Sequence, residues 1–306
     1  MRKIPEEVEY TREQLQKKID RTRRLMFFLS KASRMPDVVY GKEMFFHTAE
    51  GRIRLLAYNM DRQEALPLFV NIHGGGFTAA SAEADDKYMK DIAEKINIKI
   101  FNIDYSLAPE YPFPKALNEC YEASRFAKEH AEELGINADR IAIGGHSAGG
   151  NIGAAACIMD ADRKEIGFKG LIVDYAPLDL YTDAYLKPRP KGAIPPQASR
   201  VADPSYCHKK EDRRNPLVSP VYASIEQVKE FPPTVVITAS RDSLCGEGER
   251  FKDLLIEAAV EVTFKRFEAK HGFTHGGGPD AEEAWGMMAK HLEGCLCGKA
   301  DTIIAE

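Results

Sequence analysis

The 306-residue sequence is 44% hydrophobic and carries a formal net charge of −5. The apolar fraction suffices for a sizeable core, and the acidic balance excludes a basic surface that would attract nucleic acid. No apolar run reaches the roughly 18 residues of a membrane-spanning helix, and none follows the basic residues near Met1 as in a secretory signal. We therefore expect a cytoplasmic protein that acts on small molecules.

The six cysteines lack the regular spacing of a disulfide framework. The pair Cys295 and Cys297 has no second cysteine pair at the spacing of a zinc site. We therefore expect reduced thiols, and we predict neither a metal nor a cofactor.

Residues 1–35 predict an amphipathic helix, because apolar residues recur on one face and Lys and Arg occupy the other. The apolar positions are Val8, Leu15, Ile19, Met26 and Leu29. Such a helix could lie on a membrane surface, or its apolar face could dock on the body of the protein. We favour docking, since amphipathic surface helices are common in globular proteins.

From residue 42 onward, short apolar strands alternate with helical patterns. The expected strands are Lys42–His47, Ile53–Asn59, Leu68–Ile72, Lys99–Ile103, Arg140–Gly144, Gly170–Tyr175, Thr234–Ala239 and Val262–Phe267. The expected helices are Ala84–Lys95, Ala116–Glu133, Gly149–Asp160, Gly248–Ala259 and Ala281–Leu292. This alternation indicates an α/β fold with a mostly parallel sheet covered by helices on both faces.

The interval Leu178–Glu230 interrupts the alternation. It contains a proline-rich run, Lys187–Pro196, and a charged run, His208–Arg214. We expect an insertion above the sheet, which is either a lid over a site or a solvated excursion. We favour the lid, because long loops in compact domains are usually functional or disordered.

The segment Arg140–Gly150 carries the strongest functional signal. An apolar strand runs into Gly-His-Ser-Ala-Gly, and a helix-compatible segment follows, which is the context of a nucleophile elbow. Side chains larger than hydrogen at Gly145 and Gly149 would collide with neighbouring elements. The turn exposes the hydroxyl of Ser147 at the start of a helix, where the helix dipole favours developing negative charge. We predict that Ser147 is a nucleophile.

A serine nucleophile needs a base that is oriented by an acid. The strand Thr234–Ala239 ends shortly before Asp242, and His271 follows the strand Val262–Phe267. Because the carboxyl ends of parallel strands meet at one edge of a sheet, Asp242 and His271 are expected to gather beside Ser147.

Three alternatives compete with these assignments. His275 is a second candidate for the base, but it lies further from the end of the strand. Glu268 is a second candidate for the acid, but it precedes the histidine and sits on the wrong strand. Asp242 could instead cap the helix that begins near Gly246.

The segment Phe69–Phe77 is a buried strand that opens into a His-Gly-Gly-Gly run. Glycines let backbone N–H groups turn towards a ligand without a Cβ in the way. Together with Ala148, the N–H groups of Gly74 and Gly75 would form the oxyanion hole that acyl transfer requires. The run could instead cradle phosphate, but no Lys followed by Ser or Thr comes after it, as a P-loop would need.

These segments together resemble the hormone-sensitive-lipase-like group of α/β-hydrolases, which includes bacterial acetyl esterases. The resemblance extends from about Leu66 to Phe273 and rests on His73–Phe77, Tyr105–Glu110, Gly145–Gly150, Asp242–Glu247 and His271–Phe273. It implies an α/β-hydrolase fold with an eight-stranded sheet, with Ser147 as nucleophile, His271 as base and Asp242 as orienting acid. It also implies Gly74, Gly75 and Ala148 as oxyanion donors, with His73 and Gly76 supporting their loop.

The resemblance further implies a helical cap. We expect cap helices in residues 1–40, a cap insertion in residues 178–220, and an α/β-hydrolase core in residues 41–177 and 221–306. The chain departs from the group at His146, where Asp is frequent, and at Ser243, where Pro is usual. The glycine run Gly276–Gly278 after the base is also unusual.

The predicted function is a serine carboxylesterase that hydrolyses short-chain acyl esters through an acyl-enzyme intermediate. An amidase or formamidase on the same scaffold is the nearer alternative. A ligand-binding receptor that kept the fold without catalysis is the more distant one. The expected partner is a small-molecule ester, with no nucleic acid and no stable membrane insertion, and a homodimer is left open.

Overall fold

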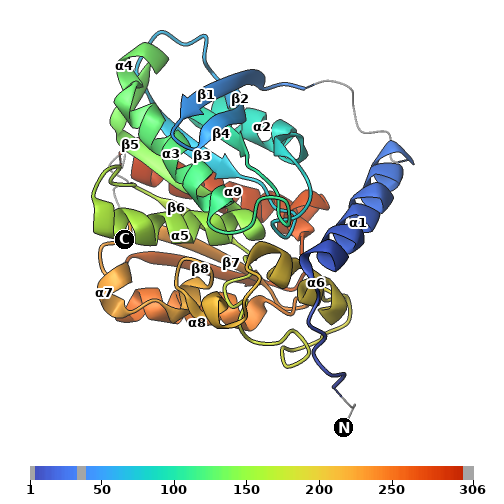
Figure 1. The fold of residues 1–306 in the computed structure, drawn as a ribbon. Helices are drawn as coiled ribbons and strands as arrows, with labels where there is room; N and C mark the ends of the chain where they lie inside the picture. Colours follow the sequence, from blue (N-terminus) through green and yellow to red (C-terminus); the bar gives the residue numbers. More distant parts are fainter. Residues whose placement is uncertain (1–3, 33–38, 299–306) are drawn as a thin grey trace.

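The computed structural model describes residues 4–32 and 39–298 of the chain. Within these residues one sheet of eight strands has the order β1-β2-β4-β3-β5-β6-β7-β8 (Figure 1). Strand β2 pairs antiparallel with β1 and β4, and all other neighbours pair parallel. The strands are β1 (Lys42–Thr48), β2 (Gly51–Tyr58), β3 (Leu66–Ile72), β4 (Lys99–Asp104), β5 (Ile136–His146), β6 (Leu171–Asp174), β7 (Thr234–Ala239) and β8 (Val262–Phe267). The predicted mostly parallel sheet is confirmed.

Helices cover both faces of this sheet, as the alternation of patterns predicts. The helices are α1 (Arg12–Ala32), α2 (Asp86–Ile96), α3 (Lys115–Glu129), α4 (Ala131–Leu134), α5 (Ala148–Arg163), α6 (Pro196–Tyr206), α7 (Ile225–Val228), α8 (Cys245–Glu257) and α9 (Pro279–Leu296). The single helix expected over Ala116–Glu133 is divided at His130 into α3 and α4. The helix expected over Ala84–Lys95 begins two residues later, at Asp86, because Ala84 belongs to a separate 3₁₀ turn, Ala82–Ala84.

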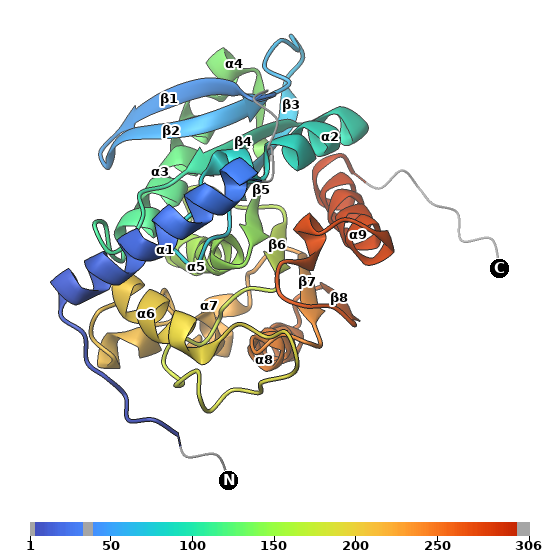
Figure 2. The ribbon, with the colours of Figure 1, turned by 90° about the vertical axis from the view of Figure 1, so that its right-hand side faces the viewer.

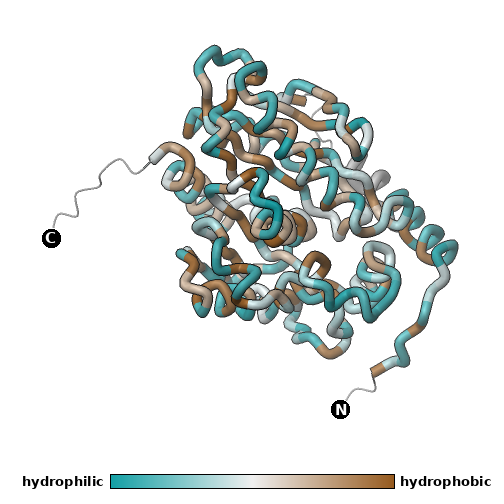
Figure 3. The backbone as a smooth tube through the Cα atoms, turned by 60° about the vertical axis from the view of Figure 1, so that its left-hand side comes forward, coloured by the Kyte–Doolittle hydropathy of each residue, from teal (hydrophilic) through white to brown (hydrophobic). Residues whose placement is uncertain are grey.

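The core divides into two apolar clusters, one on each side of the sheet. Because side chains alternate along a strand, Leu68 and Val70 face the cluster formed with α3, α5 and α8, whereas Phe69 faces the cluster formed with α2 and α9. Hydrophobic stretches of the chain, drawn in brown, run through the interior of the molecule, and hydrophilic stretches, drawn in teal, are frequent on its outside (Figure 3). The parallel strands therefore present their carboxyl ends to one edge, where the candidate site lies.

Helix α1 lies beside α6 at this edge (Figure 2). Leu15 and Ile19 are buried, as expected of a docked apolar face. Val8 is an exception, because it precedes the helix and is exposed. The side chains of Met26 and Leu29, which the same prediction included, lie outside the described residues.

Polar contacts fasten α1 to the core. The Arg23 guanidinium donates to the carbonyl oxygens of Thr78 (2.6 Å) and Ala108 (2.9 Å), and it pairs with Glu110 (2.6 Å). Both carbonyls belong to loops that follow β3 and β4, so α1 is held over the edge of the sheet. None of the described helices is both long enough and apolar enough to cross a membrane.

Candidate active site

The turn between β5 and α5 holds Ser147 in a strained backbone conformation, with φ 52° and ψ −119°. A positive φ is costly for a residue with a Cβ and persists only where the surroundings enforce it. Strand β3, which pairs with β5, restricts the backbone of this turn. A Cβ on Gly145 or Gly149 would come within 1.9 and 1.8 Å of the carbonyl oxygen of Ile72. Both positions therefore require glycine, as predicted.

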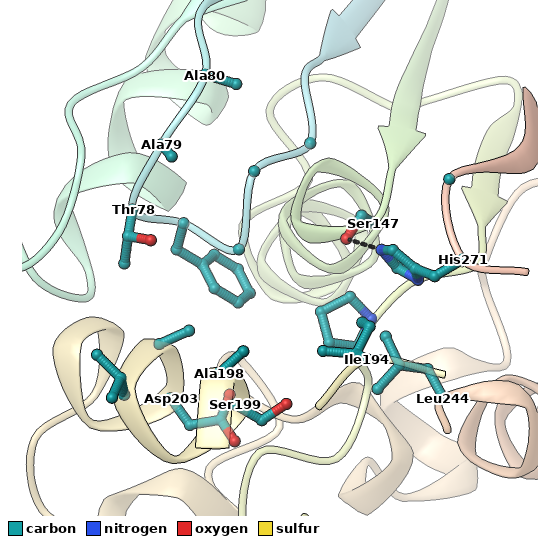
Figure 4. A pocket seen from close by; sticks show the side chains of 18 of the residues that line it. Thr78, Ala79, Ala80, Ser147, Ile194, Ala198, Ser199, Asp203, Leu244 and His271 are labelled. Atoms are coloured by element: carbon teal, nitrogen blue, oxygen red, sulfur yellow. Dashed lines mark hydrogen bonds between the residues drawn. The ribbon is translucent and has the colours of Figure 1, made fainter. Parts of the chain in front are cut away.

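The structure brings the three predicted side chains together. The Oγ of Ser147 lies 3.0 Å from Nε2 of His271 (Figure 4). Nδ1 of His271 lies 2.6 Å from Oδ2 of Asp242. Because the carboxylate of Asp242 can only accept here, Nδ1 of His271 carries a hydrogen and Nε2 is free to accept the serine proton. Asp242 is 1% exposed. This is the geometry of a serine nucleophile activated by an oriented base.

The competing residues have other partners. Nε2 of His275 lies 2.7 Å from Oδ1 of Asp85, and Glu268 is exposed on the surface. The capping alternative for Asp242 is wrong, because the N-cap of α8 is Leu244 and no side chain makes a cap hydrogen bond there. Oδ1 of Asp242 instead accepts the N–H of Leu244 itself at 3.2 Å. The same carboxylate thus anchors the start of α8 and orients His271.

The glycine loop after β3 lies against the elbow. A Cβ on Gly74 would be 3.4 Å from that of Ser147, and Gly75 has φ 118°, where a Cβ would come within 2.0 Å of the carbonyl oxygen of Ala79. Across residues 4–32 and 39–298, no hydrogen bond uses the N–H of Gly74, Gly75 or Ala148 as its donor. These three N–H groups are available to a ligand beside Ser147, as an oxyanion hole requires.

His73 supports this loop from inside the protein. The side chain is fully buried, and its Nδ1–H donates to the carbonyl oxygen of Gly74 at 2.6 Å. Its ring stacks on Tyr105 with the centroids 4.3 Å apart, and the hydroxyl of Tyr105 donates to the carbonyl oxygen of His73 at 3.2 Å. Burial lowers the pKa of His73, so the imidazole is neutral and can orient the loop without adding charge. Gly76, the last glycine of the run, has φ 59°.

A cavity of about 760 Å³ opens in front of Ser147 and His271. Its lining is mainly apolar, with contributions from α1, from the loop after β3, from α6 and from the start of α8. Figure 4 shows Ile194, Ala198 and Leu244 among the lining side chains. The sequence patterns did not identify these wall residues. The sequence feature that could have indicated α6 is Pro196, because it lies in the first turn of this helix, where proline is favoured.

One wall of the cavity carries charge. The Nζ of Lys187 pairs with Oε2 of Glu247 at 2.7 Å and donates to the carbonyl oxygen of Asp179 at 2.7 Å. Asp203 lines the same cavity. Burial raises the pKa of Glu247 and that of Asp203 each to about 7, although Lys187 opposes both shifts. In the sequence Lys187 is recognisable only as part of a proline-rich run, because nothing in its local pattern shows that the chain folds it inward.

The fold and this site define the class of protein. Residues 69–275 match the family described as alpha/beta hydrolase fold. The match covers more than half of the chain, which therefore belongs to the α/β-hydrolase family.

Individual relatives narrow this class. An arylesterase from Saccharolobus solfataricus is 31% identical over 235 residues, which are 76% of this chain and 76% of that protein. A hormone-sensitive lipase from Mus musculus is 49% identical over 85 residues, which are 28% of this chain and 11% of that protein. A hyperthermophilic esterase from Pyrobaculum calidifontis aligns with a TM-score of 0.79 and 27% identity over 91% of this chain and 93% of its own. The predicted hormone-sensitive-lipase-like group and the enzyme class, a carboxyl-ester hydrolase, are confirmed.

Proposed function

We propose that the protein hydrolyses carboxylic esters of short-chain acids through an acyl-enzyme on Ser147. The hydrogen-bonded series from Ser147 through His271 to Asp242 supports this most directly. His271 would take the serine proton as Oγ attacks the ester carbonyl, and would then give that proton to the departing alcohol. Water, deprotonated by the same imidazole, would hydrolyse the acyl-enzyme.

The available N–H groups of Gly74, Gly75 and Ala148 support the same mechanism. Charge develops on the carbonyl oxygen in both tetrahedral intermediates, and preorganised donors stabilise it without reorganisation. The volume of about 760 Å³ suits a small ligand. A long alkyl chain in this cavity would desolvate the wall that contains Lys187 and Asp203 without replacing its hydrogen bonds, which favours short acyl groups.

The test is covalent labelling with a serine-reactive phosphonate, followed by peptide mapping. We expect one equivalent of label on the peptide that contains Ser147. In Ser147→Ala, which keeps the elbow backbone, we expect no label and a loss of kcat of about 10⁴-fold or more. Retention of a tenth of the esterase activity in the pure variant would contradict the assignment. Comparing kcat/KM on a matched ester and amide separates esterase from amidase.

We further propose that residues 1–40 and 178–220 act as a cap that selects the substrate. The arrangement that supports this is the pairing of α1 with α6, both of which line the cavity, while the triad comes from the core. The extended residues before α1 also contact the insertion, since Arg200 donates to the carbonyl oxygens of Pro5 (3.1 Å) and Glu6 (3.0 Å).

Deleting residues 1–34 tests the cap. If the truncated protein keeps its fold by circular dichroism, hydrolysis of acetyl esters should persist, because every proposed catalytic group lies between Gly74 and His271. We expect the preference in a series from acetyl to decanoyl esters to shift towards longer chains, because a wall of the cavity is gone. An unchanged profile in a folded truncation would show that α1 only stabilises the protein.

A further inference from the structure

A second cluster of histidines and carboxylates borders the same cavity. It consists of Asp85, His146 and His275, each of which offers one atom that can bind a metal, and these atoms all lie within 4.8 Å of one another. In the part of the chain that the structure describes, this is the one group of three or more such residues with this convergence. The proposed mechanism uses none of the three.

Hydrogen bonds orient the two imidazoles of this cluster. Nδ1 of His146 lies 2.7 Å from Oδ2 of Asp174, and a carboxylate can only accept from it, so the lone pair of His146 is on Nε2. Nδ1 of His275 lies 3.1 Å from the hydroxyl of Tyr175, which leaves Nε2 directed at Asp85. Supporting carboxylates and hydroxyls of this kind are what orient histidine ligands in metal sites.

Asp85 is also held in place. Its Oδ2 accepts from the amide of Asn71 at 2.8 Å, while Oδ1 faces His275 at 2.7 Å. Asp85 and Asp174 are 1% and 0% exposed, so two buried carboxylates face two imidazoles. The three ligand atoms of the cluster are therefore held in place by hydrogen bonds within the protein.

We propose that Asp85, His146 and His275 bind a divalent transition-metal ion such as Zn²⁺, and that the bound ion inhibits the enzyme. Two imidazole nitrogens and one carboxylate oxygen form a ligand set that Zn²⁺ accepts, with a fourth position left for water on the cavity side. The ion would replace the hydrogen bond between His275 and Asp85.

The expected inhibition follows from the contacts that connect the proposed metal ligands with Ser147 and His271. His146 immediately precedes Ser147, and His275 lies on the same loop as His271. The ring of Tyr175, whose hydroxyl contacts His275, also packs against His271 with the centroids 4.8 Å apart. An ion that separates His275 from Asp85 therefore moves groups in contact with the base. We expect a fall in kcat with little change in KM, because the cavity walls contributed by α1 and α6 are untouched.

The sequence contains a single tryptophan, Trp285, and it lies at this site. Its ring centroid is 4.8 Å from that of His146 and 6.1 Å from that of His275. Titration of the metal-free protein with Co²⁺ should quench this fluorescence with one-to-one saturation. It should also produce visible d–d absorption without a thiolate charge-transfer band, which excludes cysteine ligands. Absence of saturable Co²⁺ binding to the wild-type protein would overturn the proposal without recourse to any variant.

Three histidine variants test whether the ion binds at the proposed ligands. His275 is the most exposed ligand, and we expect folded His275→Gln to bind Co²⁺ at least about tenfold more weakly. His47→Gln, on the exposed face of edge strand β1, is the matched control and should bind as the wild type does. His271→Gln should also retain binding. Equal affinity in His275→Gln, or loss of binding in His271→Gln, would place the ion elsewhere and overturn the proposal.

The inhibitory half rests on the proposed esterase function, whereas the binding half does not. We expect Zn²⁺ to lower kcat of the wild type and EDTA to restore it, with the inhibitory concentration raised about tenfold or more in His275→Gln. Co²⁺ binding without Zn²⁺ inhibition would refute the regulatory role alone. A metal-free protein without esterase activity would instead refute the proposed function.

Discussion

His271 and His275 lie on one loop, but their imidazoles have different partners. Nε2 of His271 faces Ser147, whereas Nε2 of His275 faces Asp85. We expect His271→Ala to lower kcat as severely as Ser147→Ala, and the double variant to be little worse than either, because the two residues act as a unit. In metal-free buffer, the loss of kcat in His275→Ala should be at least about a hundredfold smaller than the loss in His271→Ala. Steady-state kinetics on an acetyl ester, with circular dichroism as the folding control, provides the comparison.

If His275→Ala proved the more damaging of the two, the choice of base would be wrong. The sequence could predict that Ser147, Asp242 and His271 lie together, because each of them follows a strand that the sequence predicts. It could not predict Lys187 or Asp203. Their inward orientation depends on how the insertion folds back over the sheet, and that is decided by contacts between distant parts of the chain.

Strand β3 is the element that makes glycine necessary at positions 145 and 149 of the elbow. A methyl group at position 145 would overlap the carbonyl oxygen of Ile72, and a backbone atom cannot rotate away as a side chain can. We expect Gly145→Ala to lower the free energy of unfolding by about 1–3 kcal/mol. We also expect it to displace the elbow enough to reduce kcat. Chemical denaturation and esterase assays measure the two effects.

Gly286→Ala is the control for this prediction. Gly286 lies within helix α9, and an added Cβ there would meet nothing within 4 Å. Alanine is a better helix former than glycine, so this variant should gain about 0.5–1 kcal/mol and keep full activity. Equal stability of the two variants would show that β3 yields to the substitution.

The strands and helices of the core were predictable to different degrees. Strands β7 and β8 coincide with the predicted ranges. Strand β7 is short, mainly apolar and buried, whereas in the short strand β8 apolar residues are mixed with Lys265 and Arg266. Strand β5 begins earlier than predicted, at Ile136 rather than Arg140, because its first residues pair with β3 at Leu66 although some of them are exposed. Helix α6 was not predicted, since it lies in a segment that prolines and charges dominate.

The insertion above the sheet carries a half-buried carboxyl group, that of Asp203, which affects the stability of the protein. Burial raises the pKa of Asp203 to about 7, so the folded protein retains this proton between about pH 4 and 7, where the unfolded chain has released it. Stability due to this group therefore falls as the pH rises through that range. Asp203→Asn, which cannot ionise, should raise the free energy of unfolding at pH 8 and change it little at pH 4.

Urea denaturation of both proteins at pH 4, 6 and 8 measures this difference. Glu247 titrates in both proteins. The difference between their free energies of unfolding at each pH therefore reports the contribution of Asp203, as long as Lys187 stays charged. Asp253→Asn, at an exposed position of α8, is the control and should show no such slope. A gain in Asp203→Asn that is equal at all three pH values would mean that Asp203 does not hold its proton in the folded protein.

The division of the cavity between core and cap has a consequence for protein engineering. The proposed catalytic groups lie on loops of the sheet, whereas one face of α6 supplies Gln197, Ala198 and Val201 to the opposite wall. A combinatorial library confined to these three neighbouring codons would vary the shape offered to the acyl or alcohol group and leave the nucleophile, base and oxyanion donors unaltered. Substrate scope can therefore be evolved on one short helix, with each clone screened on a panel of esters for retained turnover.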